Sequence, residues 1–375
     1  MTRVVVLDIS ELIGNPVRTG IQRVVRELIR RWPADVPMRV ARHDPAKGLV
    51  AVPDMAVDLL TGRVPGVADL PSEQVARLLA GVLDRRAAAL PADPLLFVPE
   101  VFFDRRRCDF LCARLRARAD SVGFIVYDLI AWLHPDRIGV THSAPLMPYL
   151  RLLSSARRLA FISAATRADD AERVMRGGGV DGPVLALGCD GLGLERLDFA
   201  PSRRGFVCIG SIDGRKNQDL VLRAFQLLWA QGHAIPLTLV GDAFAQIDAS
   251  AFEAARAHPL FAWHRHLGDE AVRELLRTAR GTIYVSELEG YGIPPVESLH
   301  AGLPVICAAS VPSVADLPPL GQIRLARVTP EAIAEAVLTL ADDATARRLW
   351  EEARRLSLVT WDSFARQTAD WMAAA

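Results

Sequence analysis

Lysine is almost missing from this 375-residue sequence: of its 44 basic residues only Lys47 and Lys216 are lysines, and the other 42 are arginines. Asparagine is just as scarce and occurs only at Asn15 and Asn217. A bias towards arginine explains the scarcity, but it does not explain why Lys216 and Asn217 are neighbours. Lysine carries a compact charge on a flexible stem, whereas arginine presents a rigid planar fork. Position 216 therefore needs an explanation of its own.

Other absences exclude whole classes of protein. The five cysteines are scattered, and only Cys108 and Cys112 are closely spaced, so neither a disulfide framework nor a zinc site is indicated. No apolar run approaches the roughly 18 residues that suggest a membrane-spanning helix, and the first residues do not form a signal-peptide pattern. The formal net charge is zero, so we expect no nucleic-acid partner. These features predict a reduced, cytoplasmic protein.

Short apolar runs alternate with amphipathic segments along the chain. The runs are continuous, as strands buried on both faces require, and they predict parallel sheets joined by helices. Because ten strands would be many for one open sheet, we expect two Rossmann-like domains, 1–195 and 196–375, with a linker at 189–205. The predicted strands are 3–8, 95–99, 123–128, 159–163, 184–188, 206–210, 237–241, 281–285, 304–307 and 323–326. The clearest predicted helices are 21–31, 217–231, 268–280 and 330–341.

The segment 286–306 follows a predicted strand, at the end where parallel α/β sheets bind ligands. Gly290 and Gly292 let the backbone approach a ligand, and the two prolines that follow suit the first turn of a helix. The open N-terminus of such a helix predicts an anion site. Glu289 and Glu297 could contact different parts of one extended ligand. Alternatively, Glu297 is a first-turn acid favoured by the helix dipole and Glu289 a solvated loop residue, and spacing alone does not decide between these readings.

The residues around this segment resemble a known family. E-G-Y-G-I-P-P-V-E-S, followed by A-G-L-P-V-I, resembles the E-x7-E signature of the retaining GT-B glycosyltransferases of family 4. G-S-I-D-G-R-K-N-Q-D-L-V-L-R-A-F is similar to that family's phosphate-binding segment, and the likeness is continuous over roughly 205–310. In the first half, T-G-I-Q-R-V-V and Y-D-L-I resemble bacterial polysaccharide and O-antigen mannosyl- or rhamnosyltransferases.

This resemblance implies an α/β fold of GT-B type, in which two Rossmann-like domains with parallel sheets face a central cleft. The final helix, about 361–375, would cross back to the first domain. The implied activity is transfer of a hexose from a nucleotide-diphosphate donor, GDP-mannose-like, to a polysaccharide or lipid-linked glycan, with retention of anomeric configuration. Two alternatives are a catalytically inactive sugar-nucleotide-binding protein and a GT-B sugar-nucleotide epimerase. No metal or other cofactor is expected, since protein charges and a helix dipole would hold the diphosphate.

The resemblance also assigns roles to residues of the second domain. Lys216, with Arg215, would neutralise the pyrophosphate, for which a mobile point charge is suited. Ser211 occupies the place where the family usually has arginine. Glu289 would bind the donor sugar and offset positive charge at its anomeric carbon, and Glu297 would accept hydrogen bonds from the ribose. The implied phosphate and sugar contacts also include the backbone at Gly290, Tyr291, Gly292 and Ile293.

In the first domain, the resemblance implies that Gly20 brings the backbone close to the diphosphate. Tyr127 stands where many relatives have a histidine that contacts the donor sugar, and the alternative is that it packs at a strand end. Asp128 would position the acceptor or the sugar.

Arginines concentrate on two predicted helices of the first domain. Arg23, Arg26 and Arg30 share one helical face, and the range 104–120 holds six more, beside Phe110 and other apolar residues. The six are Arg105, Arg106, Arg107, Arg114, Arg116 and Arg118. One hypothesis is peripheral contact with anionic lipid at the inner face of the cytoplasmic membrane, and the alternative is solvated helix faces in an arginine-rich protein.

Overall fold

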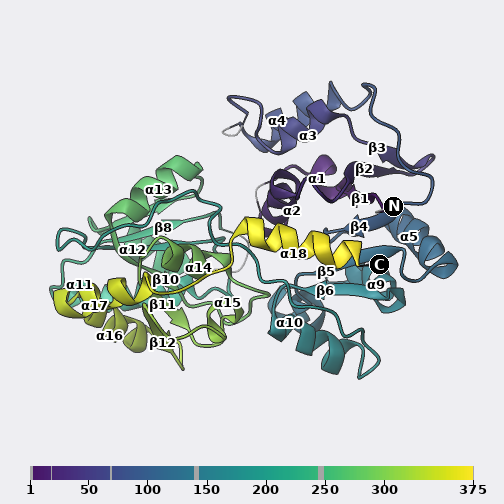
Figure 1. Ribbon diagram of the computed structural model, residues 1–375. Coiled ribbons are helices and arrows are strands. Elements are labelled where there is room, and N and C mark those ends of the chain that lie inside the picture. Colours follow the sequence, from purple (N-terminus) through teal and green to yellow (C-terminus); the bar gives the residue numbers. More distant parts are fainter. Residues whose placement is uncertain (1–2, 18, 68–69, 139–142, 244–248, 375) are drawn as a thin grey trace. The chain divides into compact units, whose positions relative to one another are not determined.

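The computed structural model describes residues 3–17, 19–67, 70–138, 143–243 and 249–374 (Figure 1). Contacts divide the chain into two units: unit 1 comprises Met1–Gly188 and Val359–Ala375, and unit 2 comprises Cys189–Leu358. Each unit contains one six-stranded sheet covered by helices. The α/β prediction with two Rossmann-like sheets is therefore confirmed, whereas a central cleft between them stays a prediction.

The sheet of unit 1 has the order β3-β2-β1-β4-β5-β6. All of its neighbouring strands pair in parallel except β2 and β3, which form an antiparallel edge. Its strands are β1 (Val5–Asp8), β2 (Met38–Asp44), β3 (Gly48–Ala51), β4 (Leu95–Val98), β5 (Val122–Val126) and β6 (Arg158–Phe161). Its helices are α1 (Ser10–Gly14), α2 (Gly20–Arg31), α3 (Asp54–Leu60), α4 (Ser72–Ala80), α5 (Arg105–Ala117), α6 (Ile130–Leu133), α7 (Pro135–Ile138), η1 (Ala144–Leu146), α9 (Met147–Ser155), α10 (Ala164–Ala168), η2 (Asp169–Val174) and α18 (Trp361–Ala373).

The sheet of unit 2 is entirely parallel, in the order β12-β11-β10-β7-β8-β9. Its strands are β7 (Gly205–Ile209), β8 (Leu237–Val240), β9 (Phe261–His264), β10 (Ala279–Tyr284), β11 (Val305–Ala308) and β12 (Gln322–Leu325). Its helices are α11 (Gln218–Ala230), α12 (Ala249–Arg256), α13 (Asp269–Thr278), α14 (Ile293–His300), α15 (Pro312–Ala315), α16 (Pro330–Ala341) and α17 (Asp343–Ala353).

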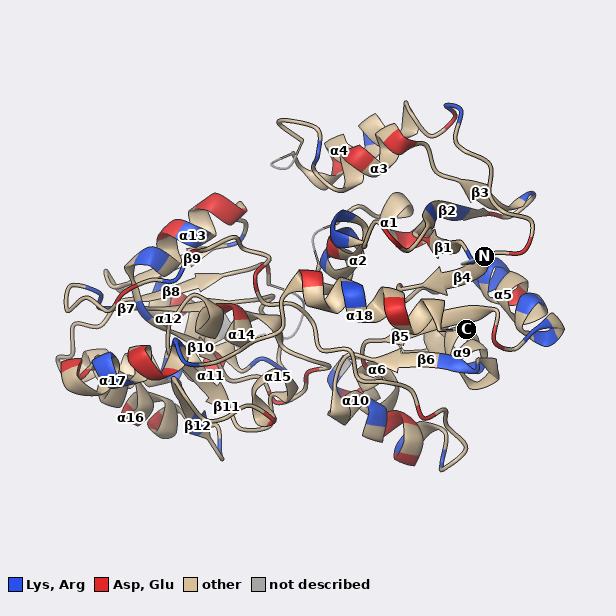
Figure 2. Cartoon of the chain, in the orientation of Figure 1, with Lys and Arg blue, Asp and Glu red and all other residues tan. Residues whose placement is uncertain are grey.

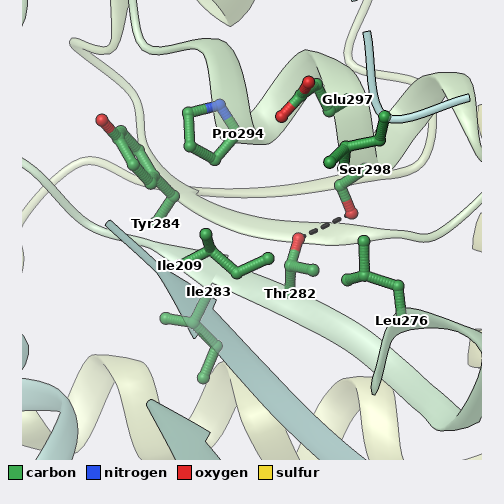
Figure 3. Close-up of a pocket in the computed structure, with 9 residues that line it drawn as sticks. Ile209, Leu276, Thr282, Ile283, Tyr284, Pro294, Glu297 and Ser298 are labelled. Carbon is green, nitrogen blue, oxygen red and sulfur yellow. Dashed lines mark hydrogen bonds between the residues drawn. The ribbon is translucent and has the colours of Figure 1, made fainter. Parts of the chain in front are cut away.

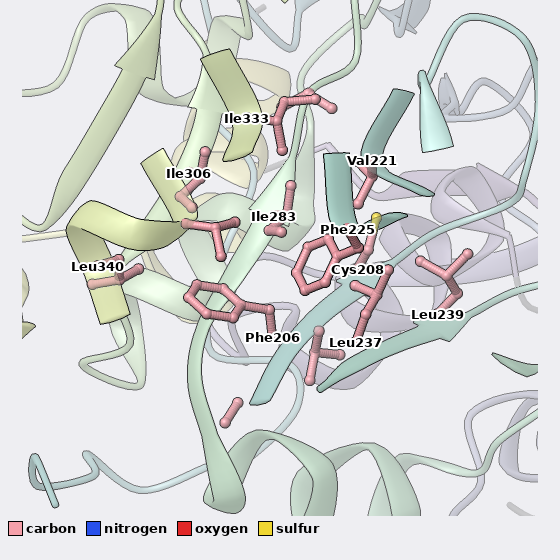
Figure 4. Close-up of a cluster of buried hydrophobic side chains, with 14 of the residues drawn as sticks. Phe206, Cys208, Val221, Phe225, Leu237, Leu239, Ile283, Ile306, Ile333 and Leu340 are labelled. Carbon is pink, nitrogen blue, oxygen red and sulfur yellow. The ribbon is translucent and has the colours of Figure 1, made fainter. Parts of the chain in front are cut away.

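The core of unit 2 shows why its strands are continuous apolar runs. Phe206 of β7 and Ile283 of β10 are buried among side chains of the covering helices, including Phe225 of α11 and Leu340 of α16 (Figure 4). The rings of Phe206 and Phe225 meet edge to face, with centroids 6.1 Å apart. Helices on both faces exclude water from a parallel sheet, so its strands are mostly apolar, and a buried polar side chain such as Thr282 in β10 needs a hydrogen-bond partner within the protein.

Helix α18 completes unit 1 although it lies at the far end of the sequence. It packs beside α2, and the ring of Trp371 meets Phe97 of β4 edge to face at 6.1 Å. Gly123 in β5 leaves room for this helix, because an added Cβ would lie 2.5 Å from Met372 Sδ. The described part of the predicted last helix thus belongs to the first unit, and its final residue lies outside the described residues.

Three strands were not predicted, and one predicted strand and the predicted domain boundary differ from the structure. β2, β3 and β9 lie at or next to sheet edges and expose part of their side chains, so they lack a continuous apolar run. Residues 184–188 were predicted as a strand but make only an isolated bridge from Val184 to Phe161. The predicted linker 189–205 instead packs on unit 2, where Leu192 and Leu194 join the core, so the division falls at Gly188 rather than at 195.

Candidate functional site

The predicted site of unit 2 is built where β7 and β10 end. These strands are parallel neighbours in the middle of the sheet, so the loops that follow them emerge at the same edge. The loop after β7 carries Lys216, and the loop after β10 carries Glu289. Gly210 lies at φ +144, and a Cβ added there would approach Lys216 Nζ to 3.3 Å, so the lysine folds back over this glycine.

The structure brings Lys216 and Glu289 together, and their roles towards a shared ligand stay a prediction. Lys216 Nζ lies 3.9 Å from Glu289 Oε1, and the two side chains are 15% and 14% exposed. The Tyr284 hydroxyl donates a hydrogen bond of 2.8 Å to the same Oε1 atom. Burial, with the nearby carboxylate, raises the pKa of Tyr284 well above its ordinary value, so the hydroxyl keeps its proton and acts as a donor.

Asn217 explains how the lysine is presented. It adopts a left-handed backbone conformation, φ 55 and ψ 31, immediately before α11. Asparagine tolerates this conformation better than most residues, which accounts for one of the two asparagines in the chain. Its Nδ2 donates to the carbonyl of Val285 at 3.0 Å and thereby ties the β7–α11 loop to the end of β10.

Arg215 is less available to a phosphate than the sequence suggested. Its Nη2 forms an ion pair of 3.2 Å with Asp213 Oδ2, and its Nε lies 3.3 Å from Asp213 Oδ1. Ser211 is also directed to this aspartate, with its Oγ 3.4 Å from Oδ2. Asp213 therefore holds both side chains in the loop, and Lys216 is left as the cation nearest to Glu289 among the described residues.

The N-terminus of α14 differs from the expected row of free N–H groups. Pro294 and Pro295 occupy its first turn and have no N–H to offer. Among the described residues, the amides of Gly292 and Ile293 have no hydrogen-bond partner, so these donors remain for an anion. Gly292 is required here, since it lies at φ +89 and an added Cβ would come within 2.8 Å of Val311 Cγ1.

Glu297 lies one turn inside α14 and is buried, at 7% exposure. It lines a small hollow between β10 and α14, where its carboxylate lies near the ring of Pro294 (Figure 3). Thr282 and Ser298 close the base of this hollow through a 2.6 Å hydrogen bond between their hydroxyls. The described geometry places Glu297 away from bulk solvent, and its role towards a ribose stays a prediction.

The predicted residues of unit 1 have a separate setting. Gly20 is exposed at the start of α2, and an added Cβ would meet nothing within 4 Å, so the protein itself does not require glycine there. Tyr127 is buried, and its hydroxyl donates to the Pro99 carbonyl at 2.8 Å, which is the geometry of the packing alternative. Asp128 is exposed, and its Oδ1 accepts from the N–H of Ile130 at 3.1 Å, at the start of α6.

The same edge of unit 1 holds a closed charged cluster that the sequence analysis missed. Arg107 of α5 contacts Asp8 Oδ2 at 2.9 Å and Glu100 Oε2 at 3.0 Å, and all three side chains are at most 2% exposed. Glu100 also accepts hydrogen bonds from the backbone N–H groups of Glu11 and Leu12 at the start of α1. The cluster therefore fixes α1 and the end of β4 against β1.

The structure removes much of the basis for the membrane hypothesis. Arg26 donates to the carbonyls of Pro16, Val17 and Leu60, and Arg30 donates to that of Thr61, so these two guanidinium groups are engaged within unit 1. On α5, Arg107 is buried. Arg114 and Arg118 pair with Asp93, and basic and acidic residues are interspersed over both units (Figure 2).

Leu111 and Leu115, which lie among the arginines of α5, belong to the core of unit 1. Among the described residues, no helix is long and apolar enough to cross a bilayer.

Tyr284 contacts Glu289 in this part of unit 2, and the sequence analysis did not single it out. A signal was present: Tyr284 lies in the predicted strand 281–285 and shares the face of Thr282, which the period of two along a strand directs towards α14. The Tyr284 hydroxyl and the carboxylate of Glu289, five residues later, therefore lie at the same edge of the sheet.

Comparisons with known proteins show what this chain is similar to. Residues 195–356 match the family model described as "Glycosyl transferases group 1". The serotype-specific mannosyltransferase WbdA of Escherichia coli is 26% identical over 339 residues, which cover 81% of this chain and 38% of WbdA. The O-antigen chain mannosyltransferase B of Escherichia coli is 34% identical over 112 residues, covering 28% of this chain and 29% of that protein. The chain thus spans well under half the length of these curated relatives.

A solved structure extends the likeness to the whole fold. HepE of Anabaena, in complex with UDP and glucose, superposes with a TM-score of 0.64 at 14% identity, with 100% of both chains covered. At this level of identity the likeness concerns the fold alone.

Proposed function

We propose that this chain, which has the GT-B fold and whose residues 195–356 belong to the group 1 glycosyl transferases, transfers a hexose from a nucleotide-diphosphate donor to a glycan. The donor would be GDP-mannose-like, and the acceptor a polysaccharide or lipid-linked glycan. The mannosyltransferases WbdA and O-antigen chain mannosyltransferase B support mannose as the sugar. HepE was solved with UDP and glucose, so a uracil base is the alternative that a test must include.

One observation carries the proposal: an ammonium and a carboxylate, Lys216 and Glu289, lie 3.9 Å apart beside the open end of α14. A diphosphate needs positive charge, and the anomeric carbon needs a negative group as it becomes cationic. The pair supplies one of each. The N–H groups of Gly292 and Ile293 and the positive end of α14 add to the attraction for phosphate.

The proposed reaction retains the configuration of the anomeric carbon, as the family resemblance implies. The bond from the anomeric carbon to the phosphate oxygen breaks, and a bond to the acceptor oxygen forms on the same face of the sugar. The proton of the acceptor hydroxyl passes to the leaving phosphate. Lys216 would stabilise the negative charge of the nucleoside diphosphate that departs, and Glu289 the positive charge on the sugar.

The experiment is transfer by the purified chain from GDP-mannose, with UDP-glucose in a parallel arm, to a mannose oligosaccharide. We expect GDP release that depends on the acceptor, and NMR of the product should show the anomeric configuration of the donor. Thermal shift with GDP, UDP, dTDP and ADP would identify the base independently. Release of free sugar without transfer, epimerised donor, or binding without turnover would each contradict the proposal.

We further propose that no metal ion is needed, because Lys216 and the end of α14 would hold the diphosphate. Transfer should then proceed at the same rate after dialysis against EDTA. A rate that falls and is restored by Mg²⁺ or Mn²⁺ would overturn this part of the proposal.

A further inference from the structure

We infer that Tyr284 is a positioning residue for Glu289, because its hydroxyl holds the carboxylate in place when Lys216 turns to the donor's phosphate. This inference rests on the proposed function. It concerns a side chain whose contacts, rather than its residue type, indicate the role.

Tyr284 is a rigid support. It ends β10, is 5% exposed, and its Cε1 lies 3.4 Å from the position that a Cβ on Gly292 would occupy. The ring is thus packed under the loop that enters α14. Because the backbone of a central strand fixes one end and packing fixes the ring, the hydroxyl has little freedom to move. Its 2.8 Å hydrogen bond to Glu289 Oε1 transmits that rigidity to the carboxylate.

Lys216 has a looser relation to the same oxygen atom. Its Nζ lies 3.9 Å from Oε1, beyond the usual hydrogen-bond range of about 2.7–3.2 Å, and 6.0 Å from the centre of the Tyr284 ring. The ammonium is therefore attracted to Glu289 without being bonded to it. It can rotate towards a phosphate at small cost, as a flexible side chain with three donors allows.

Tyr284 and Lys216 therefore have different roles: the tyrosine holds Glu289, and the lysine is free to turn towards the donor's phosphate. Among the described residues, Glu289 Oε2 has no hydrogen-bond partner, so this oxygen is available to a sugar while Oε1 is held by Tyr284. An arriving diphosphate repels the carboxylate and attracts Lys216. Without the tyrosine hydroxyl, nothing else shown at Oε1 would hold Glu289 once the lysine moves. The expected defect lies in the chemical step rather than in binding of the nucleotide.

The variant Tyr284→Phe tests this difference in roles. The kcat for transfer from GDP-mannose should fall about tenfold or more, as loss of a hydrogen bond to a charged group predicts. The Kd for GDP, measured by calorimetry, should change by less than about twofold, because the ammonium remains. Tyr149→Phe is the matched control: Tyr149 is equally buried, and its hydroxyl has no hydrogen-bond partner among the described residues, so kcat and Kd should stay at wild-type values.

A double-mutant cycle separates positioning from packing. In a Glu289→Gln background, Tyr284→Phe should lower kcat by no more than about twofold further, since the carboxylate it served is already gone. A purely structural role would lower kcat equally in both backgrounds and would lower the melting temperature.

Wild-type kcat in Tyr284→Phe, or an equal loss in both backgrounds, would overturn the inference. The wild-type chain is measured first. If it neither turns over GDP-mannose nor binds GDP, the proposed function itself is refuted.

Discussion

The carboxyl edges of the two sheets carry charged clusters that differ in burial and in how closely their charges are paired. In unit 1, Asp8, Glu100 and Arg107 are at most 2% exposed, and the ion-pair distances are 2.9 and 3.0 Å. In unit 2, Lys216 and Glu289 are more exposed, at 15% and 14%, and their charged atoms lie 3.9 Å apart. The charges of the first cluster are buried and closely paired, whereas those of the second are partly exposed and lie farther apart.

The two clusters differ in how completely the surrounding protein pairs their charges. Glu100 accepts hydrogen bonds from two backbone N–H groups, and Arg107 stacks on the Phe102 ring at 3.9 Å, so the interior of unit 1 provides the partners. Buried charges need such complete pairing. Lys216 and Glu289 do not form a direct hydrogen bond. The ammonium group could therefore donate hydrogen bonds to a polyanion without first breaking one to Glu289.

The largest effect is expected from breaking the closed cluster. Arg107→Met leaves two buried carboxylates without their cation, which should destabilise unit 1 by about 3–5 kcal/mol. Hydrogen exchange of peptides that cover β1 and β4 should accelerate, while β7 and β10 keep their protection. The matched control is Arg105→Met on the same helix, which is exposed and should have little effect. Unchanged exchange in β1 would mean that the cluster does not stabilise the fold.

Substitution of Lys216 or Glu289 should lower activity and leave stability almost unchanged. Lys216→Ala and Glu289→Ala should each lower kcat about a hundredfold or more, as loss of a group that stabilises developing charge does. Melting temperatures should stay close to that of the wild type, because both side chains are partly exposed and not fully paired. Near-wild-type transfer in either variant would contradict the site assignment.

The closed cluster should also make stability depend on pH. Burial raises the pKa of Glu100 from 4.5 to about 7, although Arg107 opposes the shift. The folded state then holds the proton more tightly than the unfolded state. The unfolding free energy should therefore decrease as pH rises from 4.5 to about 7, by up to roughly 3 kcal/mol, and be level above that range.

Urea unfolding at about pH 5 and about pH 7.5, with Glu100→Gln as the comparison, isolates this contribution from those of other carboxyl groups. The glutamine variant should show the smaller decrease between the two pH values. An equal decrease in both proteins would mean that Glu100 is ionised throughout the range.

The smallest effect concerns the loop that presents Lys216. Asn217→Gly keeps the left-handed conformation and loses the hydrogen bond to Val285, whereas Asn217→Ala also adds backbone strain. Alanine should be less stable than glycine by about 1 kcal/mol in thermal unfolding. Equal stability of the two variants would show that the loop relaxes its conformation, and the affinity for GDP would then report how far Lys216 has moved.

The sequence missed β2 and the edge strands β3 and β9, although it predicted the edge strands β6 and β12 and the other central strands. A central strand such as β4, with the sequence L-L-F-V, is buried on both faces and is apolar throughout, so its pattern is visible in the sequence. β2, β3 and β9 are partly exposed, and their pairing depends on the neighbouring strand rather than on their own residues. Residues 184–188 are apolar because they pack, and nothing in their pattern distinguished packing from pairing.

The arginines illustrate the same limit. Spacing placed Arg26 and Arg30 on one face of α2, and α2 was correctly predicted, but spacing could not show that backbone carbonyls of unit 1 accept their hydrogen bonds. The residues that share a helical face can be read from nearby sequence. The groups that this face contacts come from other parts of the chain.

By itself, the sequence determined the two α/β units, the strand ends that carry polar residues, and the isolated lysine, because periodicity, glycine and rare residue types are local properties. Only the tertiary structure decided that Arg215 is held by Asp213, that Tyr284 bonds to Glu289, and that Arg107 is buried between two carboxylates. These contacts join side chains from different strands and helices, so their distances are set by packing and are not written in any one segment.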